Sequence, residues 1–114
     1  MVVMLAAPIL PGRAEAWRRL CQELAGSRAN AFTAAASRAG ARSLRAWVLP
    51  GTRGEIALIW LDAAHPAAAL ADLAAPSTPF ERWLCEQIRL LLGIDLAMVA
   101  ETHGELVLTW NKET

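Results

Sequence analysis

Residues 55–61 read EIALIWL, and this stretch decides the fold. Its strand-forming composition predicts a β-strand, yet both of its faces are apolar. Side chains alternate along a strand, so one face carries Ile56, Leu58 and Trp60, and the other carries Ala57, Ile59 and Leu61. An antiparallel sheet with one solvated face should instead alternate apolar and polar side chains. We therefore expect both faces of this strand to be covered in the working protein.

The segments on either side of this strand predict more of the sheet. Ser43–Leu49 alternates between Leu44, Ala46 and Val48 on one side and Ser43, Arg45 and Trp47 on the other. The turn cluster PGTRG at 50–54 joins this segment to the strand, which predicts a hairpin. Val2–Ile9 is a continuous apolar run rich in strand formers, and it is closed by Pro11-Gly12. Two further strands are expected near the end of the chain, at Leu96–Ala100 and Leu106–Trp110.

Helical patterns lie between these strands. The spacing of Trp17 and the apolar residues after it predicts one long helix over Ala14–Ala39, stopped by Gly40. His65-Pro66 opens a short alanine-rich helix that ends at Pro76. Thr78 begins another helix in a capping box with Glu81, and this helix ends at Gly93. The three helices are expected at Ala14–Ala39, from Pro66 to before Pro76, and from Thr78 to Leu92.

The order of these elements is β-α-β-β-α-β with an extra C-terminal strand. In the ferredoxin-like arrangement of this order, both helical segments cover one face of an antiparallel sheet. The other face of Glu55–Leu61 would then be exposed, so we expect the sheet of a second, identical chain to cover it. Two-fold pairing is the commonest way to do so.

The composition sets the broad class. The 114 residues fit one α+β domain, 1–114, with 55% hydrophobic residues and eleven basic against eleven acidic residues. Zero net charge gives no electrostatic footprint for nucleic acid. No run reaches the length of a membrane span and no signal peptide is recognised, so the expected compartment is the cytoplasm. Cys21 and Cys85 fit buried thiols, with a disulfide or a reactive thiol as the alternatives.

Several short motifs carry a resemblance to a known superfamily. Pro11-Gly12 with Glu15 and Trp17, and Pro79-Phe80-x-x-Trp83 with Gly93-Ile94-Asp95, resemble the helix patterns of an uncharacterised actinobacterial branch of the dimeric α+β barrels. The likeness spans about residues 1 to 96. That superfamily includes antibiotic-biosynthesis monooxygenases, mutarotases, haem-degrading oxygenases and cyclases.

The resemblance implies a cofactor-independent enzyme, a monooxygenase or a cyclase, acting on an aromatic or polyketide-like molecule of secondary metabolism. The alternative is a non-catalytic dimeric module for ligand binding or interaction, because the sequence holds no recognisable acid–base constellation. Haem-degrading relatives use a helical histidine, and neither His65 nor His103 lies in a long helix. No cluster of metal ligands is apparent either, so we expect neither metal nor haem.

Arg28 is the polar residue that the helical pattern makes conspicuous. Counted from Trp17 at about 100° per residue, it falls near the centre of the apolar stripe. A desolvated arginine needs a partner, and a ligand in a pocket would provide one. The alternatives are that Arg28 extends to the helix edge or pairs with a carboxylate. We take Arg28 as the first catalytic candidate, and His65 as a second one that would otherwise cap its helix.

Ligand contacts are expected from aromatic and amide side chains. Trp47, Trp60 and Trp83 would line an aromatic cavity, together with Trp17, or else belong to the core. Gln87 falls on the apolar stripe of the last helix and is taken as a further substrate-binding residue.

Overall fold

The computed structural model describes residues 1–96 and 107–112. Seven elements follow one another, three strands and four helices. Their bounds are β1 Val2–Pro8, α1 Ala14–Ala25, α2 Ala29–Arg38, β2 Ala41–Gly51, β3 Gly54–Ala63, α3 Pro66–Ala74 and α4 Pro79–Leu92. The fold is therefore α+β, as expected.

The sheet is antiparallel with the strand order β1-β3-β2. β3 is central, and it pairs with β1 from Val2↔Asp62 to Pro8↔Ile56 and with β2 from Ala41↔Ala63 to Gly51↔Gly54, with a register shift between Ala41 and Ser43. The chain thus leaves β1, crosses over through α1 and α2 to β2, and returns by a hairpin into the space between the two. This split arrangement is compatible with the ferredoxin-like fold.

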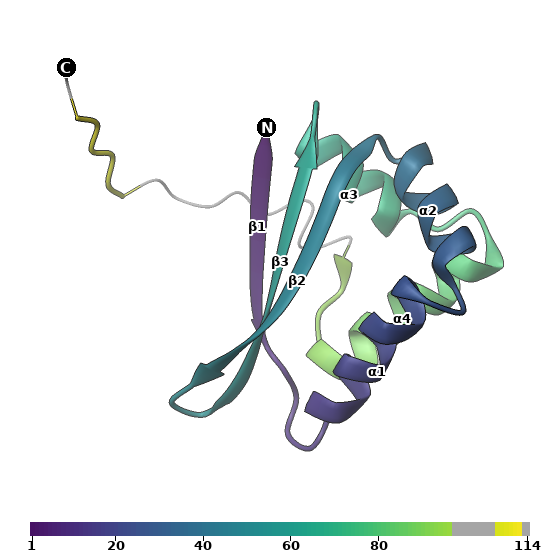
Figure 1. Ribbon diagram of the computed structural model, residues 1–114, viewed down its shortest axis with the longest axis horizontal. Helices are drawn as coiled ribbons and strands as arrows, with labels where there is room; N and C mark the ends of the chain where they lie inside the picture. Colours follow the sequence, from purple (N-terminus) through teal and green to yellow (C-terminus); the bar gives the residue numbers. More distant parts are fainter. Residues whose placement is uncertain (97–106, 113–114) are drawn as a thin grey trace.

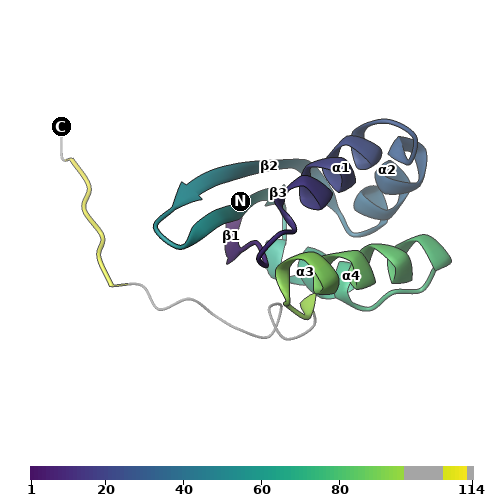
Figure 2. The ribbon, with the colours of Figure 1, turned by 90° about the horizontal axis from the view of Figure 1, so that it is seen from below.

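The four helices of the described residues cover one face of the sheet, and no described helix or strand covers the opposite face (Figures 1 and 2). On the covered face, Ala57 and Leu61 of β3 are almost fully buried. On the opposite face, the register places Met4 beside Trp60 and Leu58 beside Trp47. Met4 is 59% exposed and Trp47 is 42% exposed. We call this open apolar surface the outer face; its members are Val2, Met4, Trp47, Leu49, Ile56, Leu58 and Trp60.

The expected long helix over Ala14–Ala39 is wrong, because the chain forms two helices there. α1 ends at Gly26, whose N–H donates to the Glu23 carbonyl at 3.1 Å. The N–H of Arg28 donates to the same carbonyl at 2.8 Å, which ends the regular helical pattern. A Cβ at position 26 would lie 3.0 Å from the Gln22 carbonyl oxygen, so this bend suits glycine.

The last helix follows its sequence signals closely. Thr78 is the N-cap of α4, and its Oγ accepts from the Glu81 N–H at 3.1 Å. The Glu81 carboxylate reaches back one residue further than a capping box requires, to the N–H of Ser77 at 3.2 Å. Gly93 ends the helix in the left-handed conformation, with φ of 68°.

Glu81 also joins two helices. Among the described residues it is the one charged side chain that is buried. Its Oε1 accepts from the Arg38 guanidinium at 2.6 Å, and Arg38 stands at the end of α2. The hydrogen bonds from Arg38 and Ser77 lower the pKa of Glu81, with the Arg38 bond the larger cause. Because the carboxylate remains charged and paired, it fixes the position of α2 against the start of α4.

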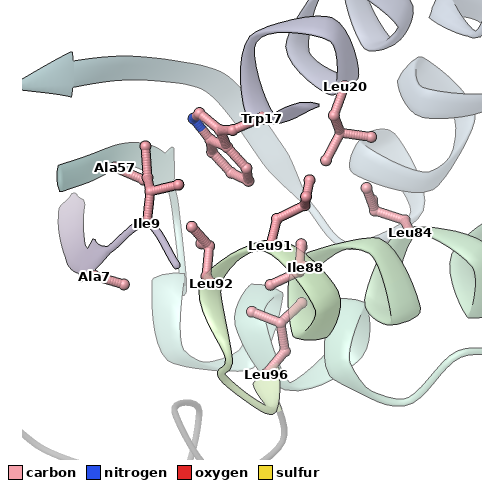
Figure 3. Packing of buried hydrophobic residues seen from close by; sticks show 10 residues of the cluster. All are labelled: Ala7, Ile9, Trp17, Leu20, Ala57, Leu84, Ile88, Leu91, Leu92 and Leu96. Carbon is pink, nitrogen blue, oxygen red and sulfur yellow. The ribbon is translucent and has the colours of Figure 1, made fainter. Parts of the chain in front are cut away.

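Two groups of buried side chains make the core. The larger group packs α1 and α4 against the sheet (Figure 3), and it consists of Ala7, Ile9, Trp17, Leu20, Ala57, Leu84, Ile88, Leu91, Leu92 and Leu96. The smaller group lies under α3 and consists of Leu61, Ala63, Ala69 and Leu70.

The C-terminal strands are not found in the described residues. The strand expected at Leu106–Trp110 is wrong for residues 107–110, which have no regular structure. Val107, Leu108 and Trp110 are between 77% and 83% exposed. The segment 107–112, yellow in Figure 1, lies apart from the sheet and the helices. A segment without a neighbouring strand has no partner for its backbone N–H and C=O groups. Leu96 is buried, and the rest of the other expected strand, residues 97–100, lies outside the described residues.

Candidate functional site

A cavity of about 330 Å³ lies between the sheet and the helices. Leu5, Leu44, Ala46, Ile59 and Leu61 form its floor on the sheet. The helices provide its roof and walls, chiefly through Trp17, Leu20, Cys21, Leu24, Phe32, Leu70, Leu73, Leu84 and Ile88. These residues come from both core groups, so the cavity separates the larger group from the smaller one. Its volume falls at the lower end of the range for small-molecule sites.

The cavity wall is largely apolar; its polar members are Arg45 of β2 and two side chains of helix α1. The first is the Cys21 thiol, whose pKa is raised by burial, so the thiol is protonated near neutral pH. The second is the indole of Trp17, which is 4% exposed. Its Nε1–H has no hydrogen-bond partner. In Figure 3 the nitrogen lies on the ring edge that is turned away from Leu91.

A second, more open cavity of about 250 Å³ adjoins the first between α1 and β2. Trp17, Cys21 and Ala46 line both cavities, so these three residues stand at the junction. The remaining lining residues of the second cavity are Arg18, Gln22, Trp47 and Val48.

Arg18 at this second cavity already has two carboxylate partners. It donates to Glu15 at 2.8 Å, and across to Glu55 of β3 at 2.5 Å. The pairing ties α1 to the sheet and neutralises the cation.

Arg28 does not lie where the helical wheel places it. It is the N-cap residue of α2 and is exposed. The expected position assumed one continuous helix from Trp17 to Arg28, and that helix ends at Gly26. Its Nε donates to Glu23 at 3.2 Å, and its guanidinium carbon lies 3.7 Å from the centroid of the Trp83 ring. The alternative of a carboxylate partner is therefore the one observed. Arg28 does not line the cavity.

The other residues singled out in the sequence are dispersed. His65 occupies the N-cap position of α3, is exposed, and makes no capping hydrogen bond through its side chain. Trp60 lies on the outer face with the Arg45 guanidinium carbon 4.9 Å from its ring centroid. Trp83 stacks at a tilt against Phe80, with ring centroids 5.8 Å apart. None of His65, Trp60 and Trp83 is among the residues lining either cavity.

Gln87 and Trp47 also lie outside the larger cavity. Gln87 is half-buried on α4 and lines neither cavity, whereas Trp47 lines the second one from the outer edge of β2. The larger cavity is thus walled by one of the four tryptophans considered, Trp17. The sequence placed Trp17 on the buried face of its helix, but a helical pattern does not distinguish a tryptophan in a packed core from one at a cavity.

The two cysteines do not form a disulfide; both are free and half-buried. Cys85 donates from its thiol to the Leu73 carbonyl at 3.3 Å. Burial raises its pKa, and the charges of Asp95 and Glu81 add to this effect. Both cysteines are therefore protonated thiols, of low nucleophilicity.

Two further features were searched for in the part of the chain that the structure describes. No group of three or more His, Cys, Asp or Glu side chains there is arranged to hold a metal ion. No helix in that part is both long and apolar enough to cross a lipid bilayer.

Comparisons with known proteins add no relative. No protein-family model, curated protein or solved structure matches the chain.

Proposed function

We propose that this protein binds a small, largely apolar molecule in the cavity between its sheet and its helices. The observation that carries this proposal is a cavity of about 330 Å³ with an almost wholly apolar wall. Close packing is the rule in protein interiors, and a void of this size forfeits contacts that a stability-driven sequence would make. A ligand would restore those contacts.

The working unit in this proposal is a homodimer with the ferredoxin-like order of a dimeric α+β barrel. Met4, Trp60 and Trp47 form an apolar surface that a monomer would leave in water. A second copy is the occupant we favour, because the chain has zero net charge and the same side of the sheet carries both Arg45 and Asp62 beside the outer face. A two-fold copy can therefore place opposite charges against each other.

Filling the cavity tests the binding proposal. Ala46 lies on the cavity floor at the junction with the second cavity, so Ala46→Phe places a ring in the space that a ligand would take. We expect native protein to give saturation-transfer NMR signals from tetralin, an uncharged bicyclic hydrocarbon, and A46F to give none. Ala34→Phe on the exposed side of α2 is the matched control and should bind tetralin like native protein. Equal binding by A46F and native protein would rule out the cavity as the site.

A second candidate function is the cofactor-independent monooxygenase or cyclase that the sequence resemblance implies. The apolar cavity supports it, because an apolar wall desolvates and orients a substrate. No general base lines the cavity among the described residues, so the substrate itself would have to reduce O₂. Anthrone is a suitable probe: with O₂ it gives anthraquinone and water. If the protein catalyses this reaction, the amount of O₂ consumed should equal the amount of anthraquinone formed. The rate of O₂ consumption should exceed the protein-free rate, and A46F should abolish this excess.

A further inference from the structure

We propose that the indole N–H of Trp17 selects the ligand, and that the ligand is an uncharged molecule with one hydrogen-bond acceptor, such as a ketone or ester carbonyl, on an apolar body. This inference rests on the binding function proposed above and specifies the chemistry of that same site.

The unpaired donor is the first step. Trp17 is 4% exposed, and its Nε1–H meets no acceptor. A buried donor without a partner loses its hydration and gains nothing in return, so such groups are rare in folded proteins and call for an explanation. Trp17 lines both cavities, so a molecule that enters either cavity touches its indole ring. The Nε1–H itself is shielded, so the ring must turn slightly for an acceptor to reach it.

A ligand acceptor satisfies this donor better than a water molecule does. A buried water needs two to four polar partners. Beside Trp17, the junction of the cavities offers the protonated thiol of Cys21 and the methyl group of Ala46. A thiol is only a weak hydrogen-bonding group. A carbonyl oxygen carried by an apolar molecule needs one donor, which Trp17 provides.

The charges around the site favour an uncharged ligand. Arg18 at the second cavity is held by Glu15 and Glu55. Arg45 contributes to the wall of the first cavity, but its guanidinium stacks on Trp60 of the outer face. Among the described lining residues, the cation without an ion-pair partner is Arg45, and its guanidinium lies against Trp60 on the face of the sheet opposite to the cavity floor. Burying an anion beside the apolar walls of the cavity is unfavourable.

The two cavities together suggest how the ligand lies. Its apolar body fills the larger cavity, among Leu24, Phe32 and Leu84. Its acceptor faces the junction, where Trp17 stands. Gln22, a neutral side chain, lines the second cavity beyond this junction.

A matched pair of probes tests the inference. Tetralin and 1-tetralone share the same two fused rings, and only 1-tetralone carries a carbonyl. The chain has five tryptophans, so protein labelled with ¹⁵N shows indole N–H signals that Trp17→Phe assigns by removal of one. We expect 1-tetralone to move the indole N–H signal of Trp17 downfield. Tetralin, which has no acceptor, should cause no such downfield shift. This measurement uses native protein and does not depend on the stability of a variant.

Affinities provide the second measurement. The ratio of the tetralin Kd to the 1-tetralone Kd measures the preference for the carbonyl. This ratio should be about tenfold larger in native protein than in Trp17→Phe, as expected for one buried hydrogen bond. Trp83→Phe, the same change at a tryptophan outside both cavities, should preserve the native ratio. The anion of tetralin-1-carboxylic acid should bind more weakly than 1-tetralone.

Each contrary result has a distinct meaning. One such result is that both probes bind while 1-tetralone leaves the Trp17 N–H signal unshifted and Trp17→Phe leaves the Kd ratio unchanged. In that case Trp17 does not select the ligand, while the binding function stands. If the carboxylate binds more tightly than the ketone, the ligand is not uncharged and the inference is wrong. If neither probe binds, the proposed function fails and this inference fails with it.

Discussion

The guanidinium carbon of Arg28 lies 3.7 Å from the centroid of the Trp83 ring. The same guanidinium donates from Nε to the Glu23 carboxylate at 3.2 Å. Glu23 is near the end of α1, Arg28 caps α2, and Trp83 belongs to α4. One arginine therefore links three helices at the point where the expected long helix breaks.

Arg28→Leu should lower the free energy of unfolding by about 0.5–1 kcal/mol, because an exposed cation–π contact and a surface ion pair are lost. It should leave tetralin binding unchanged, since Arg28 does not line the cavity. Urea denaturation and saturation-transfer NMR measure the two effects. Glu23→Gln is the control that removes only the ion pair. Loss of tetralin binding in folded R28L would restore Arg28 as a ligand-site residue.

Met4→Lys should turn a dimer into a monomer, because it places a charge in the middle of the outer face, beside Trp60. Sedimentation equilibrium at micromolar concentration should then report the 12.3 kDa chain alone. Leu90→Lys is the matched control: Leu90 is an exposed leucine on α4, away from that face, and its substitution should leave the dimer intact. A native protein that is itself monomeric would remove the basis of the barrel.

Thr78→Ala should lower the free energy of unfolding by about 1 kcal/mol, the usual effect of losing an N-cap hydroxyl. The hydroxyl accepts from the Glu81 N–H at 3.1 Å, and alanine leaves that N–H without this partner. Thr78→Ser keeps the hydroxyl and should retain most of the stability. Chemical denaturation compares the three proteins, and an alanine variant as stable as the serine variant would show that the cap contributes little.

Acid should destabilise the protein through Glu81. Its pKa lies below the ordinary value of about 4.5, because the carboxylate accepts hydrogen bonds first from Arg38 and then from Ser77. The unfolded chain therefore binds the proton more readily than the folded chain does. The stabilisation is complete above the ordinary pKa and is lost as the pH falls through the folded value.

Glu81→Gln removes this titration while keeping an oxygen for the Ser77 N–H. We expect the free energy of unfolding to fall less steeply in E81Q than in native protein when the pH decreases from about 5 to 3. Glu86, whose pKa is also lowered by its bond from Arg89, remains in both proteins and cancels in the comparison. Identical slopes would show that folding does not lower the pKa of Glu81.

The elements that the sequence predicted best are those with local causes. The hairpin around residues 50–54, the strand Val2–Pro8 and the helix from Thr78 to Gly93 are all found close to their expected bounds. Each depends on turn residues, alternation or capping within a few positions. The prediction of one long helix was wrong because the apolar pattern continues across Gly26, whereas the helical backbone ends there.

The candidate site was harder to predict, because it depends on contacts between distant segments. Trp17 and Arg28 were both assigned to one stripe, yet one is buried at the cavity and the other is exposed. The difference follows from the break at Gly26, which rotates everything after it. Trp47, Trp60 and Trp83 were grouped by residue type alone, and the fold places Trp47 and Trp60 on the outer face and Trp83 on α4.

The sequence by itself determined the α+β class, the hairpin, and the unusual apolarity of both faces of Gly54–Ala63. Alternation and capping are local properties, so residue order is enough to predict them. The tertiary structure alone decided that Arg28 stacks on Trp83 and that a cavity forms beside Trp17. A cavity depends on how closely α1, α4 and the sheet can approach, which is set by side chains far apart in the chain.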